Sequence, residues 1–392
     1  MPPHPNQVYP LLKQWYRDNA RDLPWRHTRD PWAILVCEVM SQQTPVRRVE
    51  PTWRVWLERW PQPADLAQAS PADILRVWDR MGYPRRALQL HACAIRICQE
   101  HDGRVPSEEA ALLALPGIGP YTAAAIRAFA FHEHSIVVDT NIRRVLARWH
   151  GMASPTRTGR IETEYASRYV PAEDTYPSPA EDMTQRHSRA AYQVYPAGTY
   201  QASTDIACHI HPDSACRTTT GTHNQLPANE SQQAISDGIR HAITDDDHPA
   251  PSANTPSQTA NTNSETISTD TECGITAWEW NAAIMEFGAL ICTARNPLCD
   301  HCPVRSTCDW ARSGFPDAPH DSPQRSAAWE GTNRQARGAI MAYLREHSGT
   351  YQQLLDHCNI EESRIERALA QLLADGLAAQ SGEIYHLPGL TV

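Results

Sequence analysis

The sequence predicts an all-α protein with a loop of four cysteines and a small winged-helix-like unit toward its C-terminal end. Apolar residues recur at helical spacing through residues 8–160 and again from Thr276, and residues 8–160 contain no convincing alternating strand. The cysteine loop closes the second helical region at Cys308. Residues 334–392 then hold three helical patterns and a weakly alternating stretch that is typical of a hairpin.

Capping signals mark several of these helices. Apolar spacing alone predicts a helix over residues 8–16. Asp30-Pro31 and Ser70-Pro71 each supply an N-cap side chain followed by a proline suited to the first helical turn. They predict helices over residues 32–43 and 70–81, and others are predicted over 88–99, 107–115, from about 120, 140–150, 334–346, 351–357 and 361–375.

One segment carries the net charge of −10. Residues 171–275 contain 14 Asp and Glu against 4 Arg, which leaves 31 acidic and 31 basic residues elsewhere, so the whole-chain charge is a poor guide to partners. The segment is rich in Ser, Thr, Pro and Asn and cannot bury enough apolar area to offset its chain entropy. We predict a disordered insertion that acts as a spacer, and a partner-binding segment is the alternative.

The chain shows no sign of a membrane segment or a secretion signal. No apolar stretch is long enough to span a bilayer, and no charged segment followed by an apolar run begins the chain. Eleven cysteines in such a chain indicate metal or redox chemistry before disulfides. We therefore expect a cytoplasmic protein without a membrane partner.

Four of the cysteines have the spacing of a metal site. Cys292, Cys299, Cys302 and Cys308 are separated by six, two and five residues. Four thiolates so close on one loop can wrap a single cuboidal cluster, with one cysteine for each iron. Zinc is the competing metal, but structural zinc sites pair two closely spaced knuckles, and only Cys299 and Cys302 form one. The spacing favours a 4Fe-4S cluster.

A Pro-Gly-x-Gly turn separates two of the predicted helices. Gly117 and Gly119 lie in the stretch Leu115–Ala123 and permit a tight turn with positive φ. The helix that follows begins with free backbone N–H groups, which form a ready site for an anion. An ordinary helix C-cap is the alternative. The full nine-residue pattern favours a helix-hairpin-helix that grips a DNA phosphate without reading sequence.

Two carboxylates stand in unlike surroundings. Glu38 lies on an apolar helix, where burial should raise its pKa and let it act as a general acid. Asp139 follows an apolar run and precedes a predicted helix, so its plain interpretation is an N-cap. Cleavage of an N-glycosidic bond needs such a pair, since one group protonates the leaving base and the other stays ionised against a cationic sugar.

Together these residues resemble the adenine DNA glycosylases of the MutY type, within the helix-hairpin-helix superfamily that includes endonuclease III. The resemblance covers residues 8–160 and 276–310. The stretches that carry it are Leu23-Pro24-Trp25-Arg26, Glu38-Val39-Met40-Ser41-Gln42-Gln43-Thr44, Gly82-Tyr83, the hairpin, Asp139-Thr140-Asn141 and the four cysteines.

The resemblance implies a role for each matched residue. Glu38 protonates adenine at N7, and Asp139 stabilises the cationic sugar with Asn141 as a supporting residue. Tyr121 occupies the position where bifunctional relatives carry a nucleophilic Lys, so lyase activity should be weak or absent. The residues that wedge into the duplex or contact the base opposite adenine are Gln43, Thr44, Met81 and Tyr83.

The resemblance also implies the domains and the partner. Residues 29–134 form a six-helix barrel with the hairpin, and residues 1–28, 135–170 and 276–310 form the iron–sulfur domain. The winged-helix-like domain at residues 325–392 is predicted from its sequence pattern alone. The partner is double-stranded DNA with adenine opposite 8-oxoguanine or guanine. We expect a monomer of bacterial type that associates with the nucleoid through DNA.

Three features depart from the family pattern. Ser41 stands where the family usually has Leu, and the insertion at 171–275 is much longer than the usual connection. Only 84 residues follow Cys308, where the typical member has a larger MutT-like domain that helps recognise 8-oxoguanine.

Two other functions compete with this one. An endonuclease III-like pyrimidine glycosylase is disfavoured by Tyr121 in place of Lys. A non-catalytic, cluster-bearing DNA-binding protein is disfavoured because both Glu38 and Asp139 are retained.

We predict that the chain excises adenine opposite both 8-oxoguanine and guanine, with a smaller difference between the two rates than in relatives with a MutT-like domain. Without the contacts of a whole domain, the enzyme should discriminate less between 8-oxoguanine and guanine. Each tenfold change in the preference corresponds to about 1.4 kcal/mol. The measurement is the single-turnover rate and Kd on both duplexes at fixed salt, with and without residues 325–392. The truncation should weaken binding to both duplexes alike. A strong 8-oxoguanine preference that vanishes on truncation would contradict this prediction.

Overall fold

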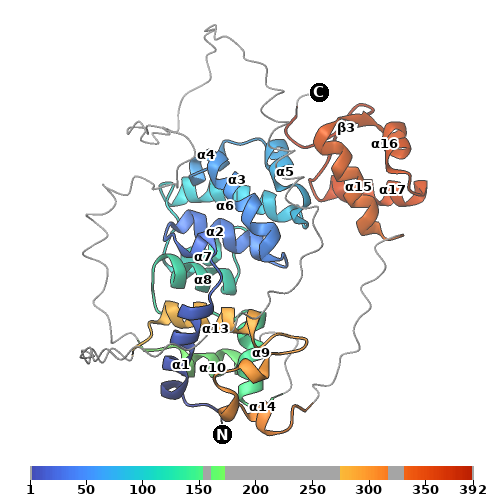
Figure 1. Ribbon diagram of the computed structural model, residues 1–392. Coiled ribbons are helices and arrows are strands. Elements are labelled where there is room, and N and C mark those ends of the chain that lie inside the picture. The colour runs from blue at the N-terminus through green and yellow to red at the C-terminus, as the bar shows by residue number, and fades with distance from the viewer. Residues whose placement is uncertain (1, 153–159, 173–273, 317–330, 391–392) are drawn as a thin grey trace, which may run out of the picture. The chain divides into compact units, whose positions relative to one another are not determined.

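The computed structural model describes residues 2–152, 160–172, 274–316 and 331–390 (Figure 1). The predicted disordered insertion at 171–275 lies outside the described residues, apart from its first two and last two residues. None of the helices that the structure describes has the length and apolar character needed to cross a bilayer.

All the regular secondary structure in residues 2–152 and 160–172 is helical, as predicted. Its helices are α1 (Pro5–Asn19), α2 (Pro31–Ser41), α3 (Val46–Arg59), α4 (Pro63–Ala67), α5 (Pro71–Trp78), α6 (Arg85–Glu100), α7 (Glu109–Ala114), α8 (Pro120–Ala130), α9 (Thr140–Trp149) and α10 (Arg160–Tyr169). Two 3-10 turns, η1 (Pro24–Arg26) and η2 (Asp79–Met81), complete the set. The predicted helix over 70–81 therefore ends at Trp78, and its last three residues form η2.

Helix α3 was not predicted, although Val49, Trp53 and Trp56 recur at helical spacing. Pro51 lies inside the helix, and two charged residues, Arg47 and Arg48, stand in its first turn. Trp53 and Trp56 are nevertheless buried, and the indole N–H of Trp53 donates to the carbonyl oxygen of Ala33 in α2 at 2.9 Å. Helices α4 and α10 were also not predicted.

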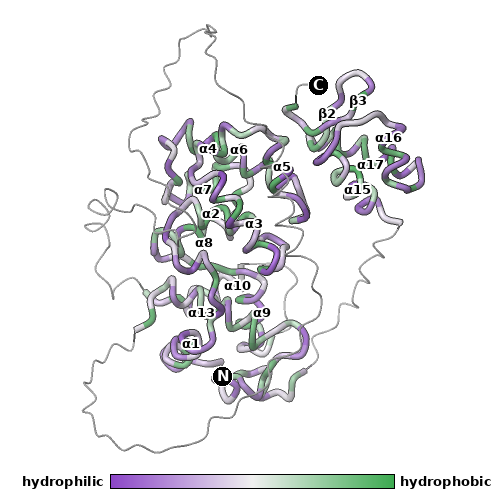
Figure 2. The backbone as a smooth tube through the Cα atoms, turned by 45° about the horizontal axis from the view of Figure 1, so that its top comes forward, coloured by the Kyte–Doolittle hydropathy of each residue, from purple (hydrophilic) through white to green (hydrophobic). Residues whose placement is uncertain are grey.

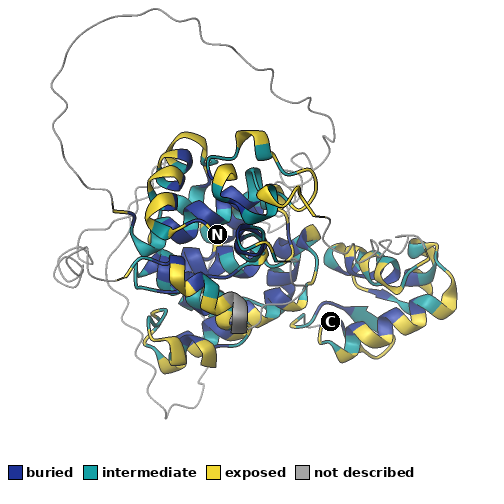
Figure 3. Cartoon of the chain, turned by 90° about the horizontal axis from the view of Figure 1, so that it is seen from below, coloured by how far each residue is buried: buried dark blue, intermediate teal, exposed yellow. Residues whose placement is uncertain are grey.

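Helix α2 is the centre of the first buried cluster. Eight of its residues are buried, so most of the helix surface is apolar (Figure 2) and covered by neighbours, while Pro31, Glu38 and Ser41 are partly exposed on one face. Helices α3, α6 and α8 pack against it. Along the helices, buried residues lie on the inward sides and exposed ones on the outer sides (Figure 3). A carboxylate on α2 is therefore forced into apolar surroundings.

A second buried cluster forms around α13 (Ala277–Leu290), whose N-cap is Thr276, the residue at which the helical pattern was predicted to resume. Helices α1 and α9 pack against it, and Trp149, Trp280 and Phe287 fill the space between them. Burial alone would raise the pKa of Glu286, but bonds from Arg21 and Arg26 outweigh it and hold the pKa at about 2. This ion pair joins the turn before α2 to α13.

The C-terminal unit has the three predicted helices and a small sheet. The helices are α15 (Asn333–Glu346), α16 (Tyr351–Cys358) and α17 (Glu362–Ala374), and the strands are β1 (Gly349–Thr350), β2 (Ala379–Ser381) and β3 (Ile384–His386). The predicted hairpin is confirmed as β2 and β3, which pair antiparallel with Gln380 opposite Tyr385. Strand β1 pairs with β3 on the other side and was too short to predict. The domain boundaries given above stay a prediction.

Candidate active site and cluster site

Three helices bring Glu38, Tyr121 and Asp139 together. Glu38 comes from the middle of α2, Tyr121 from the first turn of α8, and Asp139 from the N-cap of α9. The Tyr121 hydroxyl hydrogen-bonds the Glu38 carboxylate, and Asp139 acts electrostatically on both. Tyr121 and Asp139 follow Glu38 by 83 and 101 positions in the sequence, yet the three side chains form one group in the fold.

Glu38 is set up to hold a proton near neutral pH. Burial raises its pKa to about 7, and the negative charge of Asp139 adds to the rise. The hydrogen bond from Tyr121 opposes it, because it favours the ionised form. Burial also raises the pKa of Tyr121 well above its usual value, so the phenol stays a donor.

Asp139 is both the helix cap that its sequence position predicts and a member of this acid group. Its Oδ1 accepts from the backbone N–H of Ile142 at 2.6 Å, and its Oδ2 accepts from the side-chain amide of Asn141 at 2.8 Å. Burial raises the pKa of Asp139, while these donors and the nearby Arg144 lower it. Asp139 thus has several partners that favour its ionised form, whereas Tyr121 is the partner that favours the ionised form of Glu38.

A residue that the sequence did not single out, Arg144, supports this arrangement. Its Nη2 donates to Oδ1 of Asn141 at 2.8 Å and to the carbonyl oxygen of Gly288 at 2.6 Å. Its Nε donates to the carbonyl oxygen of Cys292 at 2.7 Å. A Cβ at Gly288 would stand 2.8 Å from Cβ of Asn141, so this close approach requires glycine.

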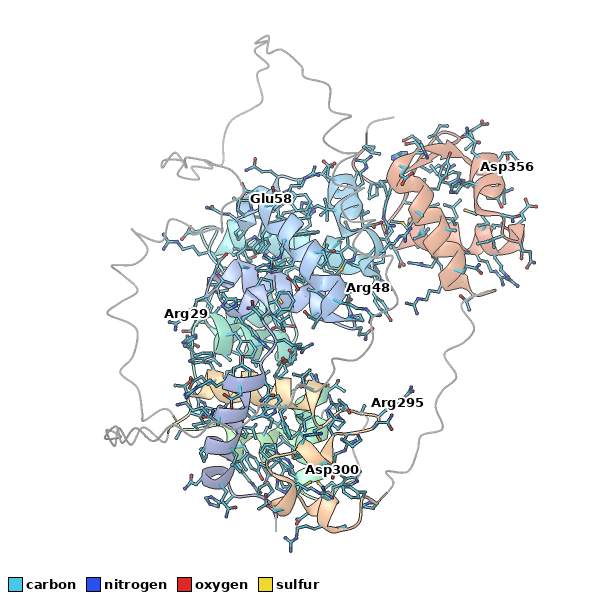
Figure 4. All side chains as sticks on the ribbon, in the orientation of Figure 1. Arg29, Arg48, Glu58, Arg295, Asp300 and Asp356 are labelled. Carbon is cyan, nitrogen blue, oxygen red and sulfur yellow. The ribbon has the colours of Figure 1, made fainter. Side chains whose placement is uncertain are left out.

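Of the four predicted contacts to the duplex, the structure exposes two. Gln43 and Tyr83 lie on the surface, and both have left-handed backbones with φ of 56° and 47°. Thr44 and Met81 are 8% and 4% exposed, so their contact with a base would require rearrangement and stays a prediction. Arg48, four residues after Thr44, is exposed (Figure 4).

In the hairpin between α7 and α8, one of the two glycines has the positive φ that was expected and the other does not. Gly117 has a φ of 80°, which favours glycine, and a Cβ there would lie 3.1 Å from Cβ of Gln89. Gly119 has a φ of −102° and is the N-cap of α8. The prediction of positive φ at Gly119 was therefore wrong, because Pro120 needs an extended residue before it at the start of a helix. Both residues stay candidates for the phosphate grip.

The four cysteines of the loop line one small cavity. Arg148, Trp149, Phe287, Ile291, Arg305, Trp310 and Ala311 line it with them. In the described part of the chain, no three metal-ligating side chains lie close enough to hold a single metal ion. The four cysteines surround this cavity from one loop, an arrangement that suits a cluster with one cysteine for each iron.

The surroundings of the loop suit bound thiolates. Burial raises the pKa of Cys302 to about 12, so its ionised form requires a positive partner such as iron. An Nη1 atom of Arg148 lies 3.3 Å from Sγ of Cys292 and 2.8 Å from the carbonyl oxygen of Thr293, which it bonds. Arg148 also packs over the ring of Trp310 at 4.6 Å.

Comparison with known proteins agrees with this geometry. Residues 36–170 match the model of the HhH-GPD superfamily of base excision DNA repair proteins, and residues 292–308 match the iron-sulfur binding domain of endonuclease III. The chain is a helix-hairpin-helix DNA glycosylase that carries a 4Fe-4S cluster and acts on DNA.

Longer matches give the particular family. An adenine DNA glycosylase of Mycolicibacterium smegmatis is 33% identical over 95% of this chain and 92% of the relative, and one of Mycobacterium tuberculosis is 34% identical over 96% and 92%. A thymine/uracil-DNA glycosylase of Pyrobaculum aerophilum is 34% identical but covers 40% of this chain and 71% of the relative. The chain belongs to the adenine DNA glycosylase family, whose members hydrolyse the N-glycosidic bond in base excision repair.

We predict that the purified protein is brown, with about four iron atoms per chain, as one cysteine per iron implies. Cys299→Ser should lower both the iron content and the yield of folded protein, because the loop loses one of its attachments. Iron and zinc analysis beside the visible spectrum makes the measurement. Cys98→Ser, in α6 and outside the loop, is the matched control and should keep its iron. A colourless wild-type protein with one zinc per chain would reject the assignment.

Proposed function

We propose that this enzyme flips adenine out of duplex DNA, where it lies opposite 8-oxoguanine or guanine, and removes it by acid-assisted hydrolysis. The observation that carries the proposal is the group of Glu38, Tyr121 and Asp139, in which the pKa of Glu38 is raised to about 7 beside a second carboxyl whose hydrogen-bond donors oppose the effect of burial on its pKa. The protonated carboxyl of Glu38 donates to N7 of adenine, so the base leaves as a neutral molecule.

Asp139 acts on the sugar that remains. As the N-glycosidic bond breaks, positive charge develops on the sugar ring, and an ionised carboxylate nearby stabilises it. The donors from Ile142 and Asn141 favour that ionised form. They also fix the direction of the carboxylate, so Asn141 is a positioning residue for Asp139.

The reaction ends with hydrolysis. The phenol of Tyr121 forms a hydrogen bond with Glu38. A phenol cannot form a Schiff base with the opened sugar. The enzyme is therefore monofunctional, or has at most weak lyase activity. Trapping with borohydride on cleaved substrate tests this separately, since a covalent adduct would require an amine nucleophile.

The helical core grips and reads the duplex as a monomer. The hairpin with Gly117 and Gly119 holds a phosphate through backbone N–H groups. Gln43 and Tyr83, which are exposed, contact the base opposite adenine and occupy the space that the flipped base leaves. The cluster is bound by Cys292, Cys299, Cys302 and Cys308, and it holds together the loop whose carbonyl oxygens accept from Arg144 and Arg148.

Glu38→Gln should abolish adenine release and leave binding to the mismatched duplex within about tenfold. The amide keeps the size and polarity of the side chain but has no carboxylic proton to give, so the chemical step alone should suffer. Single-turnover excision and Kd on the same duplex make the measurement. Asp139→Asn should also be severely impaired, since a neutral amide cannot balance the cationic sugar. Near-normal excision by Glu38→Gln would show that another group protonates the base.

The single-turnover rate should fall as the pH rises through about 7, because the active form of Glu38 is the protonated one and its pKa lies near that value. Above this pH the rate should drop about tenfold for each pH unit. Tyr121→Phe removes a hydrogen bond that lowers the pKa of Glu38, so its alkaline limb should move to higher pH. An alkaline limb that stays in place in Tyr121→Phe would contradict the bond as described.

A further inference from the structure

Arg86 lies inside the fold at the point where two exposed segments meet. The first segment follows α2 and contains Gln43, and the second follows η2 and contains Tyr83. Arg86 stands in the first turn of α6 and is 7% exposed, which is unusual for a side chain that carries a charge. Nothing in the sequence patterns or in the proposed chemistry uses this residue.

The guanidinium of Arg86 bonds both segments at once. Its Nη1 donates to the carbonyl oxygens of Val39 and Met40, each at 3.1 Å, and to that of Gln42. Its Nη2 donates to Oγ1 of Thr44 at 2.9 Å and to the carbonyl oxygens of Gly82 at 3.1 Å and Met81 at 3.5 Å. The planar fork of an arginine can span two segments in this way, whereas the single ammonium of a lysine cannot.

Two of these acceptors precede the exposed residues directly. The carbonyl of Gln42 belongs to the peptide bond that leads into Gln43, and the carbonyl of Gly82 belongs to the one that leads into Tyr83. Both following residues have left-handed backbones, which are unfavourable for residues with a Cβ and persist where surrounding contacts fix them. Arg86 supplies such a contact to each.

The side chains around the guanidinium restrict it further. Its Cζ lies 5.3 Å from the ring centroid of Trp78 and 5.4 Å from that of Tyr83, so the two rings hold it by cation–π contact. Burial lowers the pKa of Arg86 to about 10, which still leaves it charged at neutral pH. Arg86 thus contacts Tyr83 in two ways: it bonds the carbonyl of the peptide that precedes Tyr83, and its guanidinium lies over the Tyr83 ring.

We propose that Arg86 is a positioning residue that sets the direction of Gln43 and Tyr83 relative to one another, and so sets how strongly the enzyme distinguishes 8-oxoguanine from guanine opposite adenine. The inference rests on the proposed function, in which Gln43 and Tyr83 contact that base. Arg86 touches neither base nor sugar. Its effect is on discrimination, because small displacements of contacting groups change the rate or affinity for one partner more than for another.

The test compares Arg86→Met with the wild type on duplexes that carry adenine opposite 8-oxoguanine and opposite guanine. Methionine keeps an unbranched apolar stem but removes all the donors. Titration of active sites corrects each preparation for folded enzyme, since a purely structural loss lowers the active fraction equally on both duplexes. Arg96→Met is the matched control, because Arg96 lies on the same helix, is exposed and pairs with Glu100. Tyr83→Ala is measured in parallel.

We expect Arg86→Met to reduce the ratio of the two single-turnover rates about tenfold, with Arg96→Met unchanged. Tyr83→Ala should reduce the same ratio. If Tyr83→Ala lowers the ratio while active-site-corrected Arg86→Met retains the wild-type ratio, the inference about Arg86 is wrong and the proposed contact stands. If Tyr83→Ala itself keeps the wild-type ratio, the proposed contact with the opposite base is wrong, and the inference falls with it.

Discussion

The proposed chemistry depends on keeping one proton on one carboxyl group. The pKa of Glu38 lies near neutral because its carboxyl group is desolvated among the apolar residues of α2 and of the helices that pack on it, α3, α6 and α8. Burial also raises the pKa of Asp139, but hydrogen bonds from the backbone N–H of Ile142 and from Asn141 oppose that rise. The two carboxyl groups thus differ in their hydrogen-bond partners, which is the difference that the proposed division of roles requires.

Much of this site could be predicted from sequence, because its chemistry lies in short, local signals. Glu38 stands out as a carboxylate among apolar neighbours, Asp139 as a polar residue between an apolar run and a helix, and the cysteine loop by its spacing. The structure adds that Glu38 and Asp139 lie close together, with Tyr121 beside them, although they come from different helices. The family match then identifies an adenine DNA glycosylase, which no single motif could do.

The residues that sequence reasoning missed act through contacts that are distant along the chain. Arg86 and Arg144 look like ordinary charged residues on helices, yet each bonds several backbone carbonyls in the interior. Burial of Met81 and the extended backbone of Gly119 were missed for the same reason, since packing decides both. Arg144 joins Asn141, beside the acid group, to the carbonyl of Cys292 in the cysteine loop, so one hydrogen-bonded residue links that loop to the acid group.

The most direct test of this account is the pKa of Glu38 itself. Infrared difference spectra of wild type and Glu38→Gln, recorded across a pH series, isolate the carboxyl stretch of this one residue. The account predicts that the protonated band disappears with a midpoint of about 7. It also predicts a lower midpoint in Asp139→Asn, because removing that negative charge removes one cause of the raised pKa. A midpoint near the usual pKa of a glutamate would show that Glu38 is ionised at neutral pH, and would contradict its role as the acid.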